Sequence, residues 1–258
     1  MDLRFSQPQI LVLQLVSRLL ILLIALPVHE LAHALVAYRL GDVTARDYGR
    51  LSLNPLDHLD PIGALMILLG GFGWAKPVPV NPYGLYKSRS STSGFALVAL
   101  AGPVSNLFLA ALFAIPLRFE MLPSGFAQSL VVQFVWINIA LAVFNLIPIP
   151  PLDGSRIAVA VLPPQWGEYI LRLEQYGILI VLALAFTGVI GILMGPPMNF
   201  LTGQYVKFQT MVKSEKGQTL VEYALLLLLI AIVVILMLQG VGSTVNNSYS
   251  KVNSALNQ

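Results

Sequence analysis

The strongest chemical signal in this chain is the run HELAH at residues 29–33, which lies inside an apolar segment. Two histidines four residues apart, His29 and His33, share one face of a helix, where both rings can bind a single metal ion. Glu30 between them can activate a water on that metal. The run 10–26 before the motif has only three polar residues. Ionisable groups at membrane depth are costly, so they indicate a functional site.

The motif supplies two ligands, whereas a catalytic zinc usually has three protein ligands and one open position. The remaining candidates are His58, which is the third of only three histidines, and Asp153. Asp153 is the only acid between Glu120 and Glu168, and it directly follows a proline-rich break in an apolar segment. We favour Asp153 and interpret His58 as a structural hydrogen-bonding residue.

The composition is that of an integral membrane protein. Of the 258 residues, 57% are hydrophobic and 10% are charged, against about 25% charged in a typical soluble protein. The net charge of +3 comes from basic residues in loops, which indicate topology rather than a nucleic-acid surface. The absence of cysteine excludes disulfides and thiolate ligands. The first apolar run continues into HELAH, so we interpret it as retained rather than cleaved as a signal peptide.

We predict an all-α polytopic membrane protein with about four spans, a re-entrant or extended segment, and one long C-terminal helix. A span needs about 20 apolar residues, and the candidates are 10–38, 94–117, 126–147, 175–195 and 219–238. The apolar run 62–73 is too short to cross, so it is expected to re-enter the membrane or lie on its surface. The proline-rich 76–82 is expected to be extended, as an edge strand.

Three prolines end the third span, so we expect 148–151 to be extended and to present Asp153 on non-helical backbone. If the first span runs outside to inside, HELAH and Asp153 reach the same inner face. The inner loop 39–93 then carries six basic residues and the outer loop 118–125 carries one, in agreement with the positive-inside rule. We therefore predict a multi-pass protein of the cell membrane with its active site near the cytoplasmic face.

Five motifs together carry a family resemblance: HELAH, NPLDHLDPIG at 54–63, GWAKPVPVNP at 73–82, AGPVSN at 101–106 and NLIPIPPLDG at 145–154. Over about residues 10–197 the chain resembles the site-2 protease family of intramembrane zinc metalloproteases. The resemblance implies that His29, His33 and Asp153 bind one Zn²⁺ per chain and that Glu30 is the catalytic base. It implies hydrolysis of peptide bonds in or near the transmembrane helices of membrane proteins, as in regulated intramembrane proteolysis.

Further expectations follow for the surrounding motifs. Asn145, eight residues before Asp153, is a candidate donor to the oxyanion or the substrate. The extended KPVPVNP segment can pair with an unwound substrate by β-augmentation. AGPVSN is interpreted as a helix-packing motif rather than as part of the chemistry. Asn54 and Asp60 are expected to make turns before the prolines that follow them.

The C-terminal part resembles a different family, the Flp-type type IVb pilins. A basic leader precedes Gly217, Glu222 follows five residues later, and the apolar run 219–238 completes the pattern. The resemblance implies cleavage after Gly217 by a prepilin peptidase and a role for Glu222 in assembly. We therefore predict a protease-like domain at 1–197 and a pilin-like segment at 198–258, consisting of the leader 198–217, the helix 219–238 and the polar tail 239–258.

One conflict remains at the sequence level. If the fourth span crosses outward, the basic leader emerges outside, whereas prepilin leaders lie inside. The alternatives are that the fourth apolar stretch does not cross, that 196–212 re-enters, or that the fusion is artificial or a gene-level accident. An ordinary C-terminal anchor is a further reading of the tail.

The predicted partners are a transmembrane protein substrate and the lipid bilayer, with no nucleic acid. The tail adds pilin–pilin contacts, or an intramolecular contact through the C-terminal helix. Two other functions compete with the protease: a pilin-like filament subunit carried by a protease-like membrane domain, and a catalytically silent scaffold or transporter. The intact set of His29, Glu30, His33 and Asp153 argues against silence.

Overall fold

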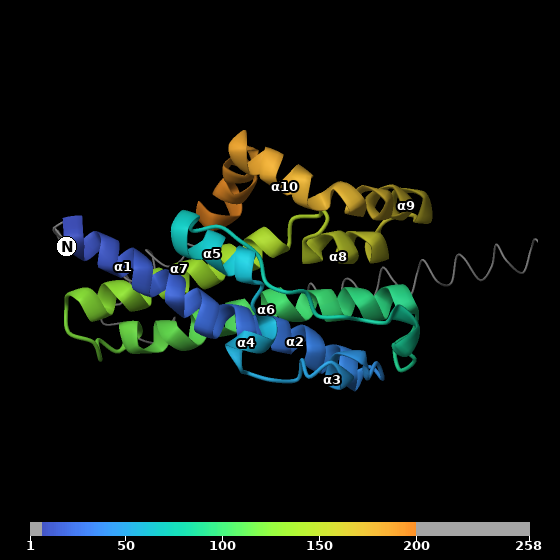
Figure 1. Cartoon of the computed structure of the whole chain (residues 1–258), viewed down its shortest axis with the longest axis horizontal. Coiled ribbons are helices and arrows are strands. Elements are labelled where there is room, and N and C mark those ends of the chain that lie inside the picture. The colour runs from blue at the N-terminus through green and yellow to red at the C-terminus, as the bar shows by residue number, and fades with distance from the viewer. Residues whose placement is uncertain (1–6, 200–258) are drawn as a thin grey trace, which may run out of the picture.

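The computed structural model describes residues 7–199, and all regular structure in this range is helical (Figure 1). The α-helices are α1 (Gln7–Leu20), α2 (Leu26–Arg39), α3 (Thr44–Asp47), α4 (Pro55–His58), α5 (Pro61–Gly70), α6 (Ser91–Arg118), α7 (Phe126–Asn145), α8 (Asp153–Val161), α9 (Pro164–Leu173) and α10 (Gly177–Phe186). A π-helix, η1 (Ile21–Ala25), and two 3₁₀ turns, η2 (Pro82–Gly84) and η3 (Glu174–Tyr176), complete the set, with a short helix at Val189–Asn199. The predicted all-α class is confirmed, and the predicted C-terminal helix lies outside the described residues.

The first transmembrane helix is one continuous rod, in which α1, η1 and α2 together cover Gln7–Arg39. In the π turn the Leu26 N–H bonds to the Ile21 carbonyl. Pro27 follows directly, and its ring would clash with the carbonyl four residues earlier in a regular helix, so a wider turn relieves that clash. At 1.5 Å per residue, His29 lies about 33 Å along the rod. The distance from the start of the rod to HELAH is therefore comparable to the thickness of a hydrocarbon core, about 30 Å.

The short helices α4 and α5, which follow α3, begin at the two turns that the sequence predicts. The side chain of Asn54 accepts a hydrogen bond from the Leu56 N–H (3.2 Å), and Asp60 accepts one from the Gly63 N–H (2.8 Å). Each cap is followed by a proline at the first helical position, where the missing N–H costs nothing. The two turns are thus N-caps of α4 and α5.

The short apolar helix α5 is fastened to the first rod. Ile67 packs with Ile21, Leu22 and Leu26 in one buried cluster. At the C-terminal end of α5, next to Ile67, Arg18 donates from Nη1 to the carbonyls of Leu68 (2.6 Å) and Leu69 (3.1 Å). These carbonyls have no partner inside the helix, so the guanidinium satisfies them. Ten residues span about 15 Å, which confirms that this segment is too short to cross a bilayer.

The proline-rich residues 76–81 are non-helical, as predicted, but they form no strand with another part of the described chain. Pairing is limited to one isolated bridge, between Leu59 and Ala75, and a backbone bond from the Lys76 N–H to the His58 carbonyl (2.8 Å). Prolines at alternate positions remove the donors that a ladder needs. The buried carboxylate of Asp42 holds the far end by accepting from the Asn81 N–H (2.7 Å).

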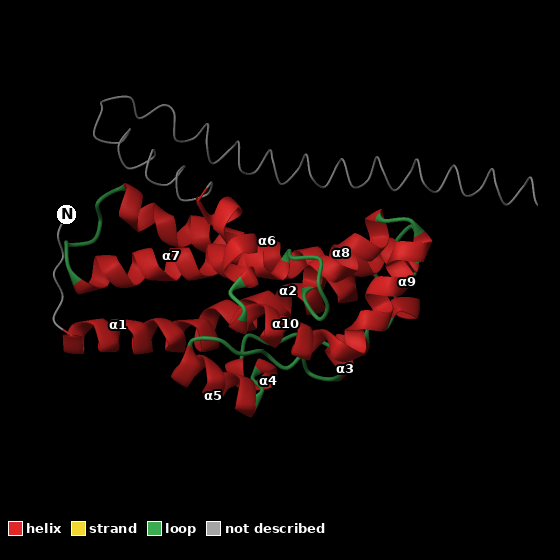
Figure 2. Ribbon diagram, turned by 90° about the horizontal axis from the view of Figure 1, so that it is seen from above, coloured by secondary structure: helices red, strands yellow, loops and turns green. Residues whose placement is uncertain are grey.

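Helices α6 and α7 form an antiparallel hairpin, and α6 packs against both α7 and α2 (Figure 2). The α2 and α6 faces are built from small buried side chains, including Ala34, Ala37 and Ala99, which let the backbones approach closely. Across the hairpin, Phe113 and Phe134 make an edge-to-face contact with centroids 4.7 Å apart. α6 therefore contacts both α2, which carries two residues of the site described below, and α7.

The chain folds into turns after α7 instead of running straight. The Ile149 N–H bonds to the Ile147 carbonyl (2.8 Å), and the Leu152 N–H bonds to the Ile149 carbonyl (2.9 Å). The Pro150–Pro151 peptide bond is cis. The helix ends at Asn145, two residues before the predicted end at 147. The extended conformation expected for 148–151 is wrong, because these local bonds curl the segment back onto the bundle. The non-helical backbone expected for Asp153 is also wrong, because this residue begins α8.

The fourth long helix also differs from the expectation. It spans Pro164–Phe186, comprising α9, η3 and α10, whereas the sequence placed it at 175–195. The amphipathic α9 runs into α10 through η3 with no break, and the chain turns at Gly188, where φ is +75°. Arg156 ties this region to the bundle through an ion pair with Glu174 and a contact over the Phe95 ring, 4.8 Å from its centroid.

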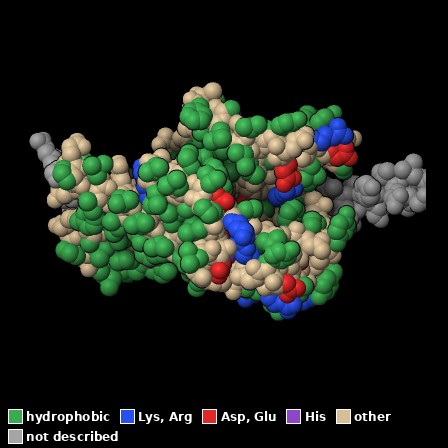
Figure 3. All heavy atoms as spheres, in the orientation of Figure 1, with side chains coloured by type: hydrophobic (Ala, Val, Ile, Leu, Met, Phe, Trp, Pro, Cys, Tyr) green, Lys and Arg blue, Asp and Glu red, His purple; other side chains and the backbone are tan. Residues whose placement is uncertain are grey.

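Within residues 7–199, four helices are long and apolar enough to cross a membrane: Gln7–Arg39, Ser91–Arg118, Phe126–Asn145 and Pro164–Phe186. On the face shown in Figure 3, most charged side chains gather toward the end that carries α3 and α9, and the opposite end is almost wholly apolar. HELAH, in the second half of the first rod, lies toward the charged end.

Candidate active site

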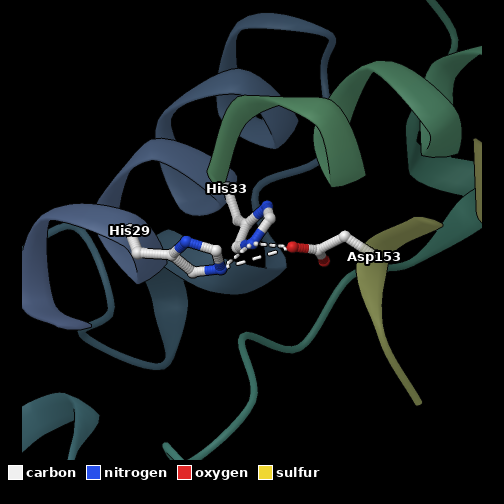
Figure 4. Close-up of side chains that lie close together, drawn as sticks. All are labelled: His29, His33 and Asp153. Atoms are coloured by element: carbon white, nitrogen blue, oxygen red, sulfur yellow. Dashed lines mark hydrogen bonds and ion pairs between the residues drawn. The ribbon is translucent and has the colours of Figure 1, made fainter. Parts of the chain in front are cut away.

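Two imidazoles from α2 and one carboxylate from the start of α8 converge at a single point (Figure 4). His29 Nε2 and His33 Nε2 are 3.0 Å apart. Asp153 Oδ2 lies 3.3 Å from His29 Nε2 and 3.4 Å from His33 Nε2. Four ligands placed tetrahedrally about 2.0–2.1 Å from zinc are separated by about 3.3–3.4 Å. The three atoms therefore fit three corners of a zinc site.

The hydrogen bonds of the two rings direct lone pairs toward this point. His29 Nδ1 faces Asn106 Oδ1 (2.5 Å), and His33 Nδ1 faces the Val98 carbonyl (2.7 Å). Both partners accept, so each neutral ring carries its proton on Nδ1 and leaves Nε2 unprotonated. Asp153 Oδ2 is buried and accepts no hydrogen bond. Three lone pairs that face each other without a proton between them fit a bound cation.

Asp153 owes its position to the glycine that follows it. A Cβ at Gly154 would collide with the carbonyl oxygens of Leu146 and Ile147. Glycine therefore lets α8 begin directly against the end of α7. Asp153 occupies the first turn of α8, where the free N–H groups of a helix favour a negative charge.

The ionisation of Asp153 depends on its neighbours. In the metal-free chain, burial raises the pKa of the carboxyl, but the facing His33 and His29 imidazoles, when they are protonated, outweigh burial and lower that pKa well below its usual range. A metal cation between the same atoms acts in the same direction. The carboxylate is thus ready to serve as an anionic ligand, which metal binding requires.

Glu30 is buried beside the ligands. Among the described residues, no hydrogen bond or ion pair engages its carboxylate, and Glu30 directly follows the ligand His29 in α2. An unengaged carboxylate next to the cluster is free to accept a proton. This arrangement agrees with the base role that the sequence predicts for Glu30, and that role remains a prediction.

Two further residues, Gly102 and Asn106 of the AGPVSN motif, shape the site. The sequence predicts helix packing for this motif and does not identify them as part of the site. A Cβ at Gly102 would lie 2.5 Å from His29 Cε1 and against His33 Nε2. Asn106, one turn further along α6, accepts from His29. The signal was present in the sequence, since Gly102 and Asn106 are four residues apart and share a helix face. The sequence alone could not show that this face packs against the two histidines of α2.

We expect Gly102→Ala to weaken zinc binding by at least about tenfold, in the range seen when groups around metal ligands are changed. The added methyl would push the imidazoles out of their present positions, while alanine itself favours a helix. Zinc affinity is measured by competition with a chelator on the folded full chain. Gly191→Ala, where a Cβ meets nothing within 4 Å, is the control. Equal affinity in both variants would contradict the steric argument.

The remaining predicted residues lie apart from the cluster. His58 is fully buried in α4, where its Nε2 donates to the Ser52 carbonyl (2.7 Å), as expected for a structural histidine. Asn145 ends α7, and its amide donates to the Leu141 carbonyl (3.0 Å). In this conformation Asn145 is committed to its own helix. Gly217 and Glu222 lie outside the described residues.

Comparison with known proteins gives two family matches. Residues 119–188, which include Asp153, match Peptidase family M50. Residues 211–256 match the Flp/Fap pilin component family. The two matches fall on the two parts of the chain for which the sequence shows separate resemblances.

Several curated proteins are similar to the first part. The Bacillus subtilis protein named "Putative zinc metalloprotease YwhC" is 44% identical over 187 residues, which are 69% of this chain and 84% of that protein. The Mycolicibacterium smegmatis protein named "Putative zinc metalloprotease Rip2" is 33% identical over 64% of each chain. A Methanocaldococcus jannaschii protein, "Putative zinc metalloprotease MJ0611", is 29% identical over 64% of this chain and 78% of its own length. No solved structure matches this chain at a significant level.

Proposed function

This chain belongs to peptidase family M50, and on that premise we propose that it is an intramembrane zinc endopeptidase. Its substrates are membrane proteins, which it cleaves in or near their transmembrane helices as a step of regulated intramembrane proteolysis. The observation that carries the proposal is the convergence of His29 Nε2, His33 Nε2 and Asp153 Oδ2, with two of the three ligands on a helix long enough to cross a membrane.

In the proposed reaction, the zinc ion and the protein side chains have separate roles. Zinc, when bound by the two histidines and Asp153, acidifies a water and polarises the peptide carbonyl. Glu30 accepts the proton of the attacking water and then delivers it to the leaving amine nitrogen. Asn106 and the Val98 carbonyl hold the two imidazoles in the required tautomer. Asn145 is proposed as a donor to the developing oxyanion, a role that requires its amide to leave the Leu141 carbonyl.

A substrate helix must unwind locally, because helical backbone hides its carbonyls. We propose that residues 76–81 hold the unwound strand. In an extended backbone the N–H groups of Val78 and Val80 face one edge, and Pro77 and Pro79 leave no donor on the other. Val80→Pro removes one donor from the useful edge and should slow cleavage. Unchanged cleavage in that variant would remove this part of the proposal.

The active site is proposed to face the cytoplasm. The support is the excess of basic residues in the loop between the first two candidate spans. The chain has no cysteine, so single substitutions report topology directly. Lys87→Cys should be protected from a membrane-impermeant thiol reagent in intact cells, and Ser124→Cys should react. The reverse pattern would invert the orientation.

The direct test uses the full chain in lipid vesicles with a model transmembrane substrate. Cleavage should cease on chelation and return with added zinc, and mass spectrometry should place the cut inside or beside the apolar segment. Cleavage that persists without metal, or cuts confined to soluble loops far from the membrane, would refute the proposal. A chain that binds zinc and never cleaves would support the silent-scaffold alternative.

A second proposal concerns the C-terminal segment, because residues 211–256 match a pilin family. We propose that 198–258 is a pilin-like unit joined to the protease-like domain at 1–197. It would supply pilin–pilin contacts or an intramolecular contact through its apolar run 219–238. Hydrophobic burial of that run against a neighbour, with Glu222 paired to a new N-terminal amine, would favour assembly.

Co-expression with a prepilin peptidase is expected to release a fragment that begins at Gln218, because the enzyme cuts after Gly217. N-terminal sequencing identifies the fragment, and Gly217→Val should abolish it. Gly242→Val, beyond the apolar run, is the matched control. Glu222→Ala should be cut normally and fail to assemble. A chain that stays intact under these conditions would favour an ordinary membrane anchor.

A further inference from the structure

Two asparagines lie fully buried in otherwise apolar helices next to the zinc ligands. Asn106 in α6 and Asn138 in α7 have no exposed surface. The Asn106 amide nitrogen donates to Asn138 Oδ1 (3.0 Å), and the Asn138 amide nitrogen donates to the Phe134 carbonyl (2.9 Å). With the contact from His29 Nδ1 to Asn106 Oδ1, this makes a continuous chain of hydrogen bonds from α2 through α6 to α7.

The chain has only one consistent direction. A backbone carbonyl can only accept, so Phe134 fixes the Asn138 side chain with its nitrogen toward that carbonyl and its oxygen toward α6. The Asn138 oxygen then requires the Asn106 nitrogen to face it. The Asn106 oxygen is left facing His29, which must carry its proton on Nδ1. The lone pair of His29 Nε2 therefore points into the metal site.

His33 needs no such chain of side-chain hydrogen bonds to fix its tautomer, because its Nδ1 contacts the Val98 carbonyl directly. An amide is different, since either of its ends can face a histidine. With its nitrogen toward the ring, Asn106 would favour a proton on Nε2, the atom that binds the metal. Something beyond Asn106 must therefore set its orientation.

We propose that Asn138 is a positioning residue for the zinc site, which acts through Asn106 to fix the tautomer and orientation of His29. It touches neither metal nor substrate. The inference rests on the proposed zinc function. The competing explanation is that the two asparagines only join α6 to α7, since interhelical hydrogen bonds between polar side chains are common in membrane bundles. Joining alone predicts a change in stability with no change in metal affinity.

The test measures zinc affinity by chelator competition on the full chain in detergent, beside thermal unfolding. Asn106→Ala should weaken zinc by about 10–100-fold and Asn138→Leu by about tenfold. Asn138→Ser is a second, milder variant, because its hydroxyl can still bond the carbonyl one turn back but is too short to reach Asn106. Val135→Ala, a buried apolar neighbour in α7, is the control and should change stability alone.

A double-mutant cycle separates a relay from two independent effects. If Asn138 acts through Asn106, the variant Asn106→Ala/Asn138→Ser should bind zinc no more weakly than Asn106→Ala alone. In the cobalt-loaded chain, Asn138→Ser should also shift the visible absorption bands that report ligand geometry. Additive losses, or zinc affinity and cobalt bands equal to those of the wild type in a folded Asn138 variant, would overturn the proposal.

Two controls distinguish a failure of the Asn138 proposal from a failure of the proposed zinc function. Wild type should bind zinc near one per chain, and His33→Ala should lose it. If wild type binds no zinc, the zinc function itself is wrong. If wild type binds zinc and both Asn138 variants bind equally well, the function stands and only the relay is refuted.

Discussion

Glu30→Gln is expected to retain one zinc per chain and to lose about 10²–10⁴-fold of its turnover, the usual contribution of a general base. Glutamine has nearly the same size and shape, so it preserves the packing of a residue that is only 8% exposed. It cannot accept a proton from the attacking water. The Glu30 side chain makes no hydrogen bond with the described residues, so the substitution breaks no observed contact.

The measurement pairs zinc content with cleavage of a model transmembrane substrate, with wild type beside the variant. Glu168→Gln, on the exposed face of α9, is a matched control and should leave both quantities unchanged. Full activity in Glu30→Gln would refute the base assignment. Loss of zinc together with activity would instead mean that Glu30 shapes the metal site.

Asp153→Ala is expected to weaken zinc by more than the 10–100-fold that follows changes around the ligands, because it removes one of three ligands outright. The remaining histidines would hold the ion with two nitrogens. Asp153→Asn keeps the size of the side chain and removes only its charge, so it separates the loss of an anionic ligand from a change in the fold.

Zinc affinity is again measured by chelator competition, and thermal unfolding of the metal-free chain verifies the fold. Asp47→Ala, an exposed acid in α3, is the control. Unchanged zinc affinity in Asp153→Ala would point to His58 as the third ligand. Its position in α4, bonded to the Ser52 carbonyl, argues against that outcome.

The parts of the site that come from local sequence could be predicted, because spacing alone fixes them. His29 and His33 share a helix face whatever surrounds them, and the prolines after Asn145 had to end a helix. The approach of Asp153 to the histidines is a tertiary contact, for which the topology and charge bias gave only a consistent orientation. The actual spacing of the three ligand atoms needed the folded chain.

The errors have specific physical causes. An asparagine in an apolar helix indicates that its side chain must form hydrogen bonds, but the sequence does not identify the partner. The position of Asn106 and Asn138 beside the metal site was therefore not predicted. The fourth span was predicted at 175–195, after the charged residues Glu168, Arg172 and Glu174, whereas the long helix already begins at Pro164 and includes them. The segment 148–151 was expected to be extended because proline forbids a helix, but local turns meet the same restriction.

The positions of the three ligands in the chain also have a consequence for the stability of the fold. A zinc ion held by His29, His33 and Asp153 ties the first helix to a turn about 120 residues further along the chain. The ion would hold these distant segments together only in the folded chain, because the three ligand atoms converge only there. Metal that binds only the folded protein raises its stability with the logarithm of the free concentration. Zinc supply would therefore set the stability of the folded chain as well as the proposed cleavage.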